Sequence, residues 1–385
     1  MSGRARWEKG AYGLGNGLSP AGDEEIAVEL VGVRRNFGQF QAVRDVSFQL
    51  GNSQFLTLLG ASGSGKSTTL MMIAGFLEPS AGEIFLAGRR ANGLEPHKRN
   101  LGVVFQNYAL FPHMTVFDNL AFPLRTRGFD RNTVNKRVGS ALELVHLGEF
   151  TNRMPIQLSG GQQQRIALAR ALIYDPPVLL MDEPLGALDR KLRVQLQLEI
   201  KRIQRERRVS VIYVTHDQDE ALTMSDRIAV MDRGRVVQIG HPEDIYDRPE
   251  TEFVAAFVGD MNFFRIVDRR IVDGTKYAVT EDLLAIRRPE VADQENQSSN
   301  LAVLRPERIL IGPTVEPTSK SDDKTQTLTG VIEDIIYTGE SRRYVVRVGP
   351  RLIVVKRQSE DVAGRFARGD HVSISWRVTD VRWLP

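Results

Sequence analysis

The stretch FLTLLGASGSGKSTTLMMIAGF, residues 55–76, holds a Gly-rich loop between two apolar segments. Residues 55–59 form a short apolar run, which predicts a strand buried on both faces, and residues 68–76 have a helical pattern. The loop between them, residues 60–67, has the spacing G-x-x-x-x-G-K-[ST], which binds phosphate when a strand precedes it and a helix follows it. The sequence therefore predicts an α/β domain organised around a phosphate-binding loop.

The residue types in this loop suit a nucleotide phosphate and a divalent metal. Its glycines allow backbone N–H groups to turn inward, and the following helix adds about half a positive charge at its N-terminus. We expect Lys66 to approach the β- and γ-phosphates and the Ser67 hydroxyl to bind Mg²⁺. The alternative is a Gly-rich strand-to-helix turn without a ligand, which the flanking strand and helix disfavour. The loop alone does not define the class of nucleotide hydrolase.

Strand-like and helix-like segments alternate from about residue 26 to residue 240. Residues 178–181 and 209–214 are further apolar runs, and we expect both to be strands buried on both faces. Apolar residues recur at helical spacing in residues 130–147 and again after Asp189, which suits a helix N-cap. This alternation is typical of an α/β domain.

The pattern changes after residue 259, where period-two alternation replaces helical periodicity. Apolar residues alternate with polar ones in residues 344–348 and 372–376, and Gly349-Pro350 predicts a turn between two strands. Polar residues 293–300 and 317–325 predict loops. We expect a flexible Gly-rich tail over residues 1–25, the α/β domain over 26–258, and a small all-β, OB-like barrel over 259–385.

Composition excludes several kinds of protein. Lys and Arg total 51 against 48 for Asp and Glu, an excess too small to indicate a nucleic-acid surface. There is no cysteine, so disulfides and thiolate metal sites are excluded. No apolar run approaches the roughly 18 residues that cross a bilayer, and residues 1–25 lack the apolar centre of a secretory signal. We expect a soluble chain whose membrane role, if any, requires a partner.

Two carboxylates follow the predicted strand at residues 178–181. Asp182 stands at the tip of this strand, where it can hold a metal beside the phosphate loop. The adjacent Glu183 can polarise an attacking water molecule. A pair of this kind is also common as ordinary solvent-facing charge, so its significance depends on the phosphate loop.

The stretch LSGGQ, residues 158–162, discriminates best between classes of protein. Ser159 and Gln162 have the spacing of a capping box at the start of a largely apolar helix. Gly160 and Gly161 beside this cap expose the first N–H groups of the helix to an anion. Here the chain resembles the ATP-binding-cassette (ABC) ATPases, whose signature sequence is LSGGQ. That resemblance covers residues 26–258 and implies a cassette with a helical subdomain.

Other positions match the motifs of that family in the same order. The resemblance implies that Gln106 senses Mg²⁺ and water and couples to the transport channel. Residues 185–189 match its dimer-contact loop, with Asp189 as the acidic residue, and His216 matches the histidine that contacts the γ-phosphate. Phe37 matches the aromatic residue that stacks on adenine, although Phe40 is close and equally aromatic. The residues expected to bind ATP are Phe37, Gly60, Ser62, Gly63, Gly65, Lys66, Ser67, Thr68, Ser159, Gly160, Gly161, Gln162 and Asp189; those expected to act in hydrolysis are Glu183, His216 and Gln106; those expected to hold Mg²⁺ are Ser67, Gln106 and Asp182.

The resemblance also implies an assembly. In this family the signature of one subunit closes over the γ-phosphate held by the other, so we expect a head-to-tail homodimer with two ATP molecules in its interface. A single cassette without a long coiled-coil insertion or zinc-type cysteines disfavours the alternative, a soluble ABC ATPase of DNA repair or translation.

The C-terminal residues favour an importer. LRPE at 304–307, YTG at 337–339 and GDHV at 369–372 resemble the small β-barrel of importer ATPases, where the barrel adds dimer contacts and sometimes regulation. Residues 257–264 look most like the spermidine/putrescine branch, with sugar, iron and sulfate importers as alternatives. The implied partners are integral membrane permease subunits and, indirectly, an extracytoplasmic solute-binding protein, with no nucleic acid. The implied location is the cytoplasmic face of the cell membrane.

Overall fold

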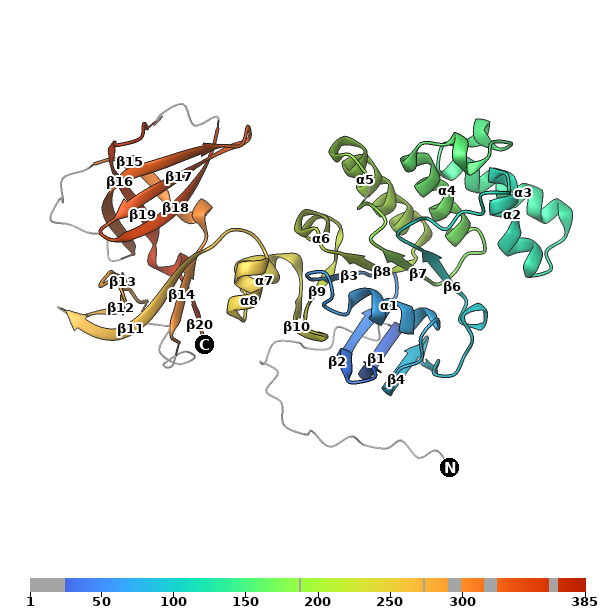
Figure 1. Cartoon of the computed structure of the whole chain (residues 1–385), viewed down its shortest axis with the longest axis horizontal. Coiled ribbons are helices and arrows are strands. Elements are labelled where there is room, and N and C mark those ends of the chain that lie inside the picture. The colour runs from blue at the N-terminus through green and yellow to red at the C-terminus, as the bar shows by residue number, and fades with distance from the viewer. Residues whose placement is uncertain (1–24, 187, 273, 290–298, 315–323, 360–365) are drawn as a thin grey trace.

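The computed structural model describes residues 25–186, 188–272, 274–289, 299–314, 324–359 and 366–385. The predicted tail, apart from Glu25, and most of the two predicted polar loops lie outside these residues. Figure 1 shows two lobes, an α/β lobe followed by an all-β lobe, with α7 and α8 between them. Within the described ranges, no helix is both long enough and apolar enough to cross a membrane.

A six-stranded sheet forms the centre of the first lobe. Its order is β10-β9-β3-β8-β7-β6, and its strands are parallel except for β10, which pairs antiparallel with β9. Every residue of β3, β7 and β8 is buried, as expected for parallel strands covered on both faces. The three predicted strands are therefore confirmed: β3 has the predicted bounds, β7 ends one residue later, and β8 begins and ends one residue later. The bounds are Arg235–Gly240 (β10), Arg227–Asp232 (β9), Phe55–Leu59 (β3), Ser210–Thr215 (β8), Val178–Asp182 (β7) and Leu101–Val104 (β6).

A second, antiparallel sheet was not identified from the sequence. Its order is β2-β1-β4-β5, with bounds Phe40–Gly51 (β2), Ile26–Phe37 (β1), Ala81–Leu86 (β4) and Arg89–Arg90 (β5). The pairing of β1 with β2 shifts register at several points, so buried side chains do not alternate regularly along β1. The apolar residues of this sheet share one core with those of α1 and of one side of the central sheet.

The helix predicted after the phosphate loop is α1, Lys66–Ala74. It begins and ends two residues earlier than expected, and it ends at Ala74 because Gly75 adopts a left-handed conformation with φ 85° and caps its C-terminus. The helix predicted over residues 130–147 is α3, Arg131–Leu144, with Asp130 as its N-cap. Asp189 is likewise the N-cap of α5, Arg190–Arg207, as predicted.

A helical layer packs beside the central sheet. It consists of α2 (Val116–Thr126), α3 and α4 (Gly160–Leu172), which share a core with α5 and with one side of the sheet. Figure 1 shows these three helices at the far end of the α/β lobe from the all-β lobe. Helix α6, Gln218–Met224, follows β8 on the side nearer the all-β lobe.

Two five-stranded sheets build the second lobe around one core. Trp376 and Ile374 of one sheet and Phe264 of the other belong to that core. The predicted turn at residues 349–350 joins β17 and β18, which pair antiparallel. The orders are β13-β12-β11-β14-β20 and β15-β19-β16-β17-β18. The bounds are Asn262–Val272 (β11), Thr275–Thr280 (β12), Ala285–Arg287 (β13), Leu301–Leu304 (β14), Leu310–Pro313 (β15), Thr325–Tyr337 (β16), Ser341–Val348 (β17), Arg351–Gln358 (β18), His371–Arg377 (β19) and Arg382–Leu384 (β20).

The buried Arg305 connects the two lobes. Its guanidinium donates to the backbone carbonyls of Val258 and Asp260 at 2.6 and 3.1 Å, and it lies 3.8 Å from the ring centre of Tyr246. Tyr246 belongs to α7, Pro242–Asp247, and Val258 follows α8, Glu252–Phe257. A charged donor that satisfies several buried carbonyls is costly to remove. Arg305 therefore holds the start of the all-β lobe against the end of the α/β lobe.

Candidate functional site

The phosphate loop lies between β3 and α1 and has little room for side chains. A Cβ atom at Gly60 would lie 2.3 Å from the carbonyl oxygen of Met231, and one at Gly65 would lie 2.6 Å from that of Ala42. Gly63 and Gly65 have φ values of 80° and 99°, which side-chain-bearing residues rarely adopt. The backbone of this loop therefore requires glycine at both motif positions, Gly60 and Gly65, and favours it at Gly63 as well.

Lys66 and Ser67 begin α1 and point to the ends of the neighbouring strands. Lys66 is buried, and its Nζ donates to the carbonyls of Gly60 and Ala61 at 2.8 and 2.9 Å. Burial lowers the pKa of Lys66, although the carboxylates of Glu183 and Asp182 partly oppose this. An ammonium group held at the loop by backbone carbonyls can exchange them for the oxygens of a phosphate.

Ser67 and Asp182 form a pair of oxygen donors at the tip of β7. The Ser67 hydroxyl donates to Asp182 Oδ1 at 2.8 Å, and Asp182 is only 7% exposed. Burial raises the pKa of the Asp182 carboxyl, and the Ser67 hydrogen bond only partly opposes this. A hard cation binds carboxylate and hydroxyl oxygens and stabilises a buried negative charge. These two side chains therefore fit a Mg²⁺ ion.

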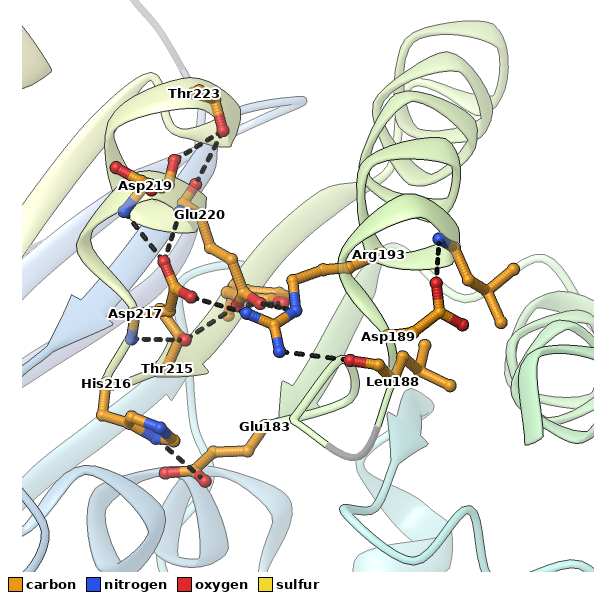
Figure 2. Close-up of polar contacts among 12 residues, drawn as sticks. Glu183, Leu188, Asp189, Arg193, Thr215, His216, Asp217, Asp219, Glu220 and Thr223 are labelled. Atoms are coloured by element: carbon orange, nitrogen blue, oxygen red, sulfur yellow. Dashed lines mark hydrogen bonds and ion pairs between the residues drawn. The ribbon is translucent and has the colours of Figure 1, made fainter. Parts of the chain in front are cut away.

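Glu183 and His216 face each other across the ends of two adjacent strands. Glu183 follows β7 directly, His216 follows β8 directly, and His216 Nδ1 lies 3.2 Å from Glu183 Oε2 (Figure 2). The Glu183 backbone has φ 43°, an uncommon conformation for a residue with a side chain, and such strain is concentrated at functional sites. In this pair, the Glu183 carboxylate can act as a base and the His216 imidazole can orient it.

A buried polar cluster lies behind His216 and was not predicted from the sequence. Glu220 is 3% exposed, and its Oε2 accepts from the hydroxyls of Tyr213 and Thr215 at 2.8 and 2.7 Å. Arg193 lies beside it, with Nη1 2.9 Å from Asp217 Oδ2 (Figure 2). Burial raises the pKa values of both Glu220 and Tyr213. A sequence signal existed, because Asp217 and Glu220 closely follow His216 and Arg193 lies four residues after Asp189.

The LSGGQ segment forms the predicted capping box. Gln162 N–H donates to the Ser159 hydroxyl at 3.3 Å, and the Gln162 side chain accepts from Ser159 N–H at 2.9 Å. Ser159 and Gly160 are exposed, whereas Gly161 packs tightly against Leu192 of α5. Helix α4, which begins at Gly160, lies in the helical layer of Figure 1, apart from α1. The fold of one chain therefore does not bring LSGGQ onto its own phosphate loop.

Gln106 is exposed just after β6, in a segment that contacts α4. Arg170 of α4 donates to the carbonyls of Ala109 and Tyr108 at 2.8 and 2.9 Å. Tyr108 and Ala109 have positive φ values of 61° and 48°. The guanidinium thus holds a strained turn that follows Gln106, and it connects this turn to the helix that begins with LSGGQ.

Phe37 ends β1, and its ring is 45% exposed, with the Arg35 guanidinium 4.6 Å from the ring centre. Phe40, at the start of β2, is 63% exposed and pairs with Phe37 across the hairpin. Both rings are available for stacking, so the geometry does not choose between them. Ala187, within the predicted dimer-contact loop, lies outside the described residues.

Taken together, the ends of three adjacent parallel strands gather groups for phosphoryl transfer. β3 leads to the phosphate loop, β7 to Asp182 and Glu183, and β8 to His216. Ligands in open α/β sheets bind outside the carboxyl ends of the strands. The arrangement can bind a polyphosphate with its metal and activate a water molecule beside it.

Comparison with known proteins gives a consistent result. A family model described as ABC transporter matches residues 43–186, and one described as TOBE domain matches residues 302–384. The chain is 44% identical over 368 residues to the spermidine/putrescine import ATP-binding protein PotA of Rubrobacter xylanophilus, covering 91% of this chain and 92% of that protein. It is 44% identical over 371 residues to the protein of the same name from Thermobifida fusca, covering 94% of this chain and 93% of that one.

A solved structure is also similar. It is described as the dimeric structure of a bacterial ABC transporter cassette, and it matches with a TM-score of 0.52 and 33% sequence identity. The match covers 56% of this chain and 98% of the solved chain.

Proposed function

The chain belongs to the family of ABC transporter ATP-binding proteins, and from this premise we propose that it is the ATP-hydrolysing subunit of a polyamine importer. Its relatives over nine-tenths of its length carry the name spermidine/putrescine import ATP-binding protein, which supports this substrate over sugar, iron or sulfate. One observation supports ATP hydrolysis most directly. The phosphate loop, Asp182, Glu183 and His216 lie together at the ends of β3, β7 and β8.

The ATP-binding residues divide by the part of the nucleotide they contact. The backbone of the loop, with Gly60, Ser62, Gly63, Gly65 and Thr68, cradles the phosphates, and Lys66 supplies a positive charge to them. Ser67 and Asp182 would hold Mg²⁺, with Gln106 as a further side-chain donor and phosphate oxygens and water as the other ligands. Bound Mg²⁺ neutralises charge that develops on the phosphate oxygens. Phe37 stacks on the base.

Hydrolysis requires a base and a group that orients the water. Glu183 accepts the proton of the attacking water, and His216 keeps that carboxylate and the water in line with the γ-phosphate. The raised pKa of Asp182 is consistent with a buried carboxyl whose ionised form gains further stabilisation when a cation binds.

ATP binds between two copies of the chain. Ser159, Gly160, Gly161 and Gln162 of one copy meet the γ-phosphate on the loop of the other, and Asp189 belongs to the loop that contacts the partner. The exposure of Ser159 and Gly160, away from the loop of their own chain, supports this head-to-tail arrangement. The similar solved cassette is a dimer. The TOBE domain at residues 302–384 adds dimer contacts.

The dimer drives separate membrane subunits. Phe111, Pro112 and Met114 lie in the segment after Gln106 and form the groove where the permease docks on the cytoplasmic face of the membrane. Arg170 supports this segment, because its guanidinium holds Tyr108 and Ala109 and stacks 5.5 Å from the Phe111 ring centre. A solute-binding protein delivers the polyamine from outside.

The experiment that tests this function is capture of the intact complex. A tagged Glu183→Gln variant is trapped with MgATP in membranes of its own host, and the proteins that co-purify are identified by mass spectrometry. Recovery of integral membrane subunits supports the importer, and polyamine uptake lost on their deletion supports the substrate. Recovery of ribosomal or DNA-repair proteins without membrane subunits would overturn the importer and leave the ATPase.

A further inference from the structure

Arg193 connects two segments of the site that are distant in sequence. It lies on the first turn of α5, and its Nη2 donates to the backbone carbonyl of Leu188 at 3.2 Å. Its Nη1 donates to Asp217 Oδ2 at 2.9 Å, and its Nε lies 3.8 Å from Glu220 Oε1 (Figure 2). One planar guanidinium thus contacts both the loop before α5 and the turn that follows β8.

The backbone on both sides of His216 is fixed by this same cluster. Before it, the Thr215 hydroxyl donates to Glu220 Oε2 at 2.7 Å and accepts from Asp217 N–H at 3.0 Å. After it, Asp217 Oδ1 accepts from the N–H groups of Asp219 and Glu220 at 2.9 and 3.1 Å. The His216 side chain itself remains 55% exposed and contacts Glu183. The imidazole therefore projects from a turn whose flanking residues are hydrogen-bonded to this cluster, Thr215 to Glu220 and Asp217 to Arg193.

We propose that Arg193 is a positioning residue that sets His216 relative to Glu183 according to the position of the Leu188–Asp189 segment. This inference rests on the proposed function, in which that segment contacts the partner subunit and His216 orients the water. When the partner displaces Leu188, the guanidinium shifts with the carbonyl and carries Asp217 with it. His216, between Thr215 and Asp217, then moves toward or away from Glu183. Hydrolysis at one site thereby depends on contact made by the other subunit.

The geometry of the guanidinium distinguishes this role from simple charge neutralisation. Arg193 uses two different nitrogens for the carbonyl and the carboxylate, and its Nε points toward a third group. A lysine keeps the charge but cannot present this planar set of donors. Replacement by lysine should therefore preserve the fold near Asp217 while breaking the connection to Leu188.

The test compares Arg193→Lys with a matched control on the same helix. Arg202 also pairs with a carboxylate and a carbonyl, because Nη1 contacts Glu206 at 2.9 Å and Nη2 donates to Leu144 at 3.0 Å. It lies more than two turns along α5 from the site, so Arg202→Lys should leave hydrolysis unchanged. For Arg193→Lys we expect kcat to fall on the order of 10- to 100-fold, the loss that a misplacement of about 1 Å produces, with little change in KM for ATP or in melting temperature.

A double-mutant cycle with Asp217→Asn supplies the second readout. If both residues act through one connection, the double variant loses no more kcat than the more damaged single variant. Any one of three results would overturn the inference. Arg193→Lys could keep the wild-type kcat, or the losses in the cycle could be fully additive. ATP affinity and melting temperature could also fall in parallel with kcat. Loss of hydrolysis in Glu183→Gln beside unchanged hydrolysis in Arg193→Lys would overturn this inference alone. Absence of hydrolysis in the wild-type complex would overturn the proposed function as well.

Discussion

His216 Nδ1 lies 3.2 Å from Glu183 Oε2, and the two residues follow directly on the neighbouring parallel strands β8 and β7. Neither side chain is fully buried, since the exposed fractions are 55% for His216 and 18% for Glu183. A water molecule can therefore reach both groups, while the strand ends fix their separation. Proton transfer needs a base within hydrogen-bonding distance of its target, and a water molecule between these two side chains would meet that requirement for Glu183.

The first prediction concerns the base. Glu183→Gln should reduce ATP hydrolysis by a factor on the order of 10²–10⁴, because an amide cannot accept the proton of water. MgATP binding should persist, since the loop and Asp182 are unchanged. Phosphate release and nucleotide affinity measure the two effects separately. Glu143→Gln, an exposed carboxyl on α3, is the control and should hydrolyse normally. Undiminished hydrolysis in Glu183→Gln would mean that another group is the base.

The second prediction follows from the buried Asp182. Burial raises the pKa of its carboxyl above the usual 3.8, so the folded protein binds this proton more tightly than the unfolded chain does. The stability of the ligand-free protein therefore decreases as pH rises from 3.8 through the raised value. Asp182→Asn should remove this decrease and should raise the melting temperature at pH 7 by about 2–4 °C, the effect of roughly 1 kcal/mol in a domain of this size.

The same variant should lose the stabilisation that MgATP gives to the wild type, because an amide is a weaker ligand for a hard cation than a carboxylate. Thermal unfolding between pH 4 and pH 7, with and without MgATP, checks both effects. A less stable ligand-free variant would count against a destabilising burial of the Asp182 carboxylate. An unchanged response to MgATP would count against Asp182 as the metal ligand.

The parts of the fold that were predicted correctly have strong local signals. β3, β7 and β8 are continuous apolar runs buried at every position, α3 lies within the predicted helical segment 130–147, and α5 begins at the predicted cap Asp189. The sheet of β1, β2 and β4 was missed because its bulges interrupt the period-two pattern. Local patterning therefore identified buried strands and capped helices better than it identified strands with β-bulges.

The parts of the site that were missed depend on tertiary contact. Arg193 and Asp217 are 24 residues apart and meet because α5 contacts α6, and their closeness in sequence to Asp189 and His216 does not by itself indicate that they pair. The left-handed backbone of Glu183 also has no sequence signal, because nothing in a carboxylate side chain requires φ 43°. The roles of the site residues stay predictions, whereas the distances between them are findings.

The third prediction concerns the contact between the two lobes. Burial, together with the hydrogen bond that Tyr246 donates to Glu307, raises the pKa of Tyr246 to about 12. The pKa of tyrosine in an unfolded chain is about 10. This contact therefore stabilises the folded protein below that pH, and the stabilisation is lost as the pH rises from about 10 to about 12. Tyr246→Phe should cost about 1 kcal/mol at pH 7 and should remove this alkaline dependence.

The measurement is unfolding at a series of pH values, with absorbance of the ionised phenol followed in the wild type and the variant. The chain has 8 tyrosines, so the difference between the two titrations isolates Tyr246. Tyr337→Phe is the control, because Tyr337 is 64% exposed. A difference titration centred near pH 10 would show that the Glu307 contact does not hold the phenol.

The last prediction tests the arrangement of the two subunits. Ser159 and Gly160 are exposed at the start of α4, and a large cation there would collide with a nucleotide presented by another chain. Ser159→Arg should therefore prevent the ATP-dependent dimer that Glu183→Gln accumulates, which size-exclusion chromatography measures, and nucleotide binding to the monomer should persist because the loop lies elsewhere in the same chain. Ser140→Arg, an exposed serine on α3, adds the same charge and size to the helical layer and should dimerise normally.

If the Ser159→Arg, Glu183→Gln double variant still dimerised with ATP, the signature would not contact the partner's nucleotide. If Ser159→Arg also abolished nucleotide binding to the monomer, the site would be formed within one chain, against the separation of α4 and α1 in the fold.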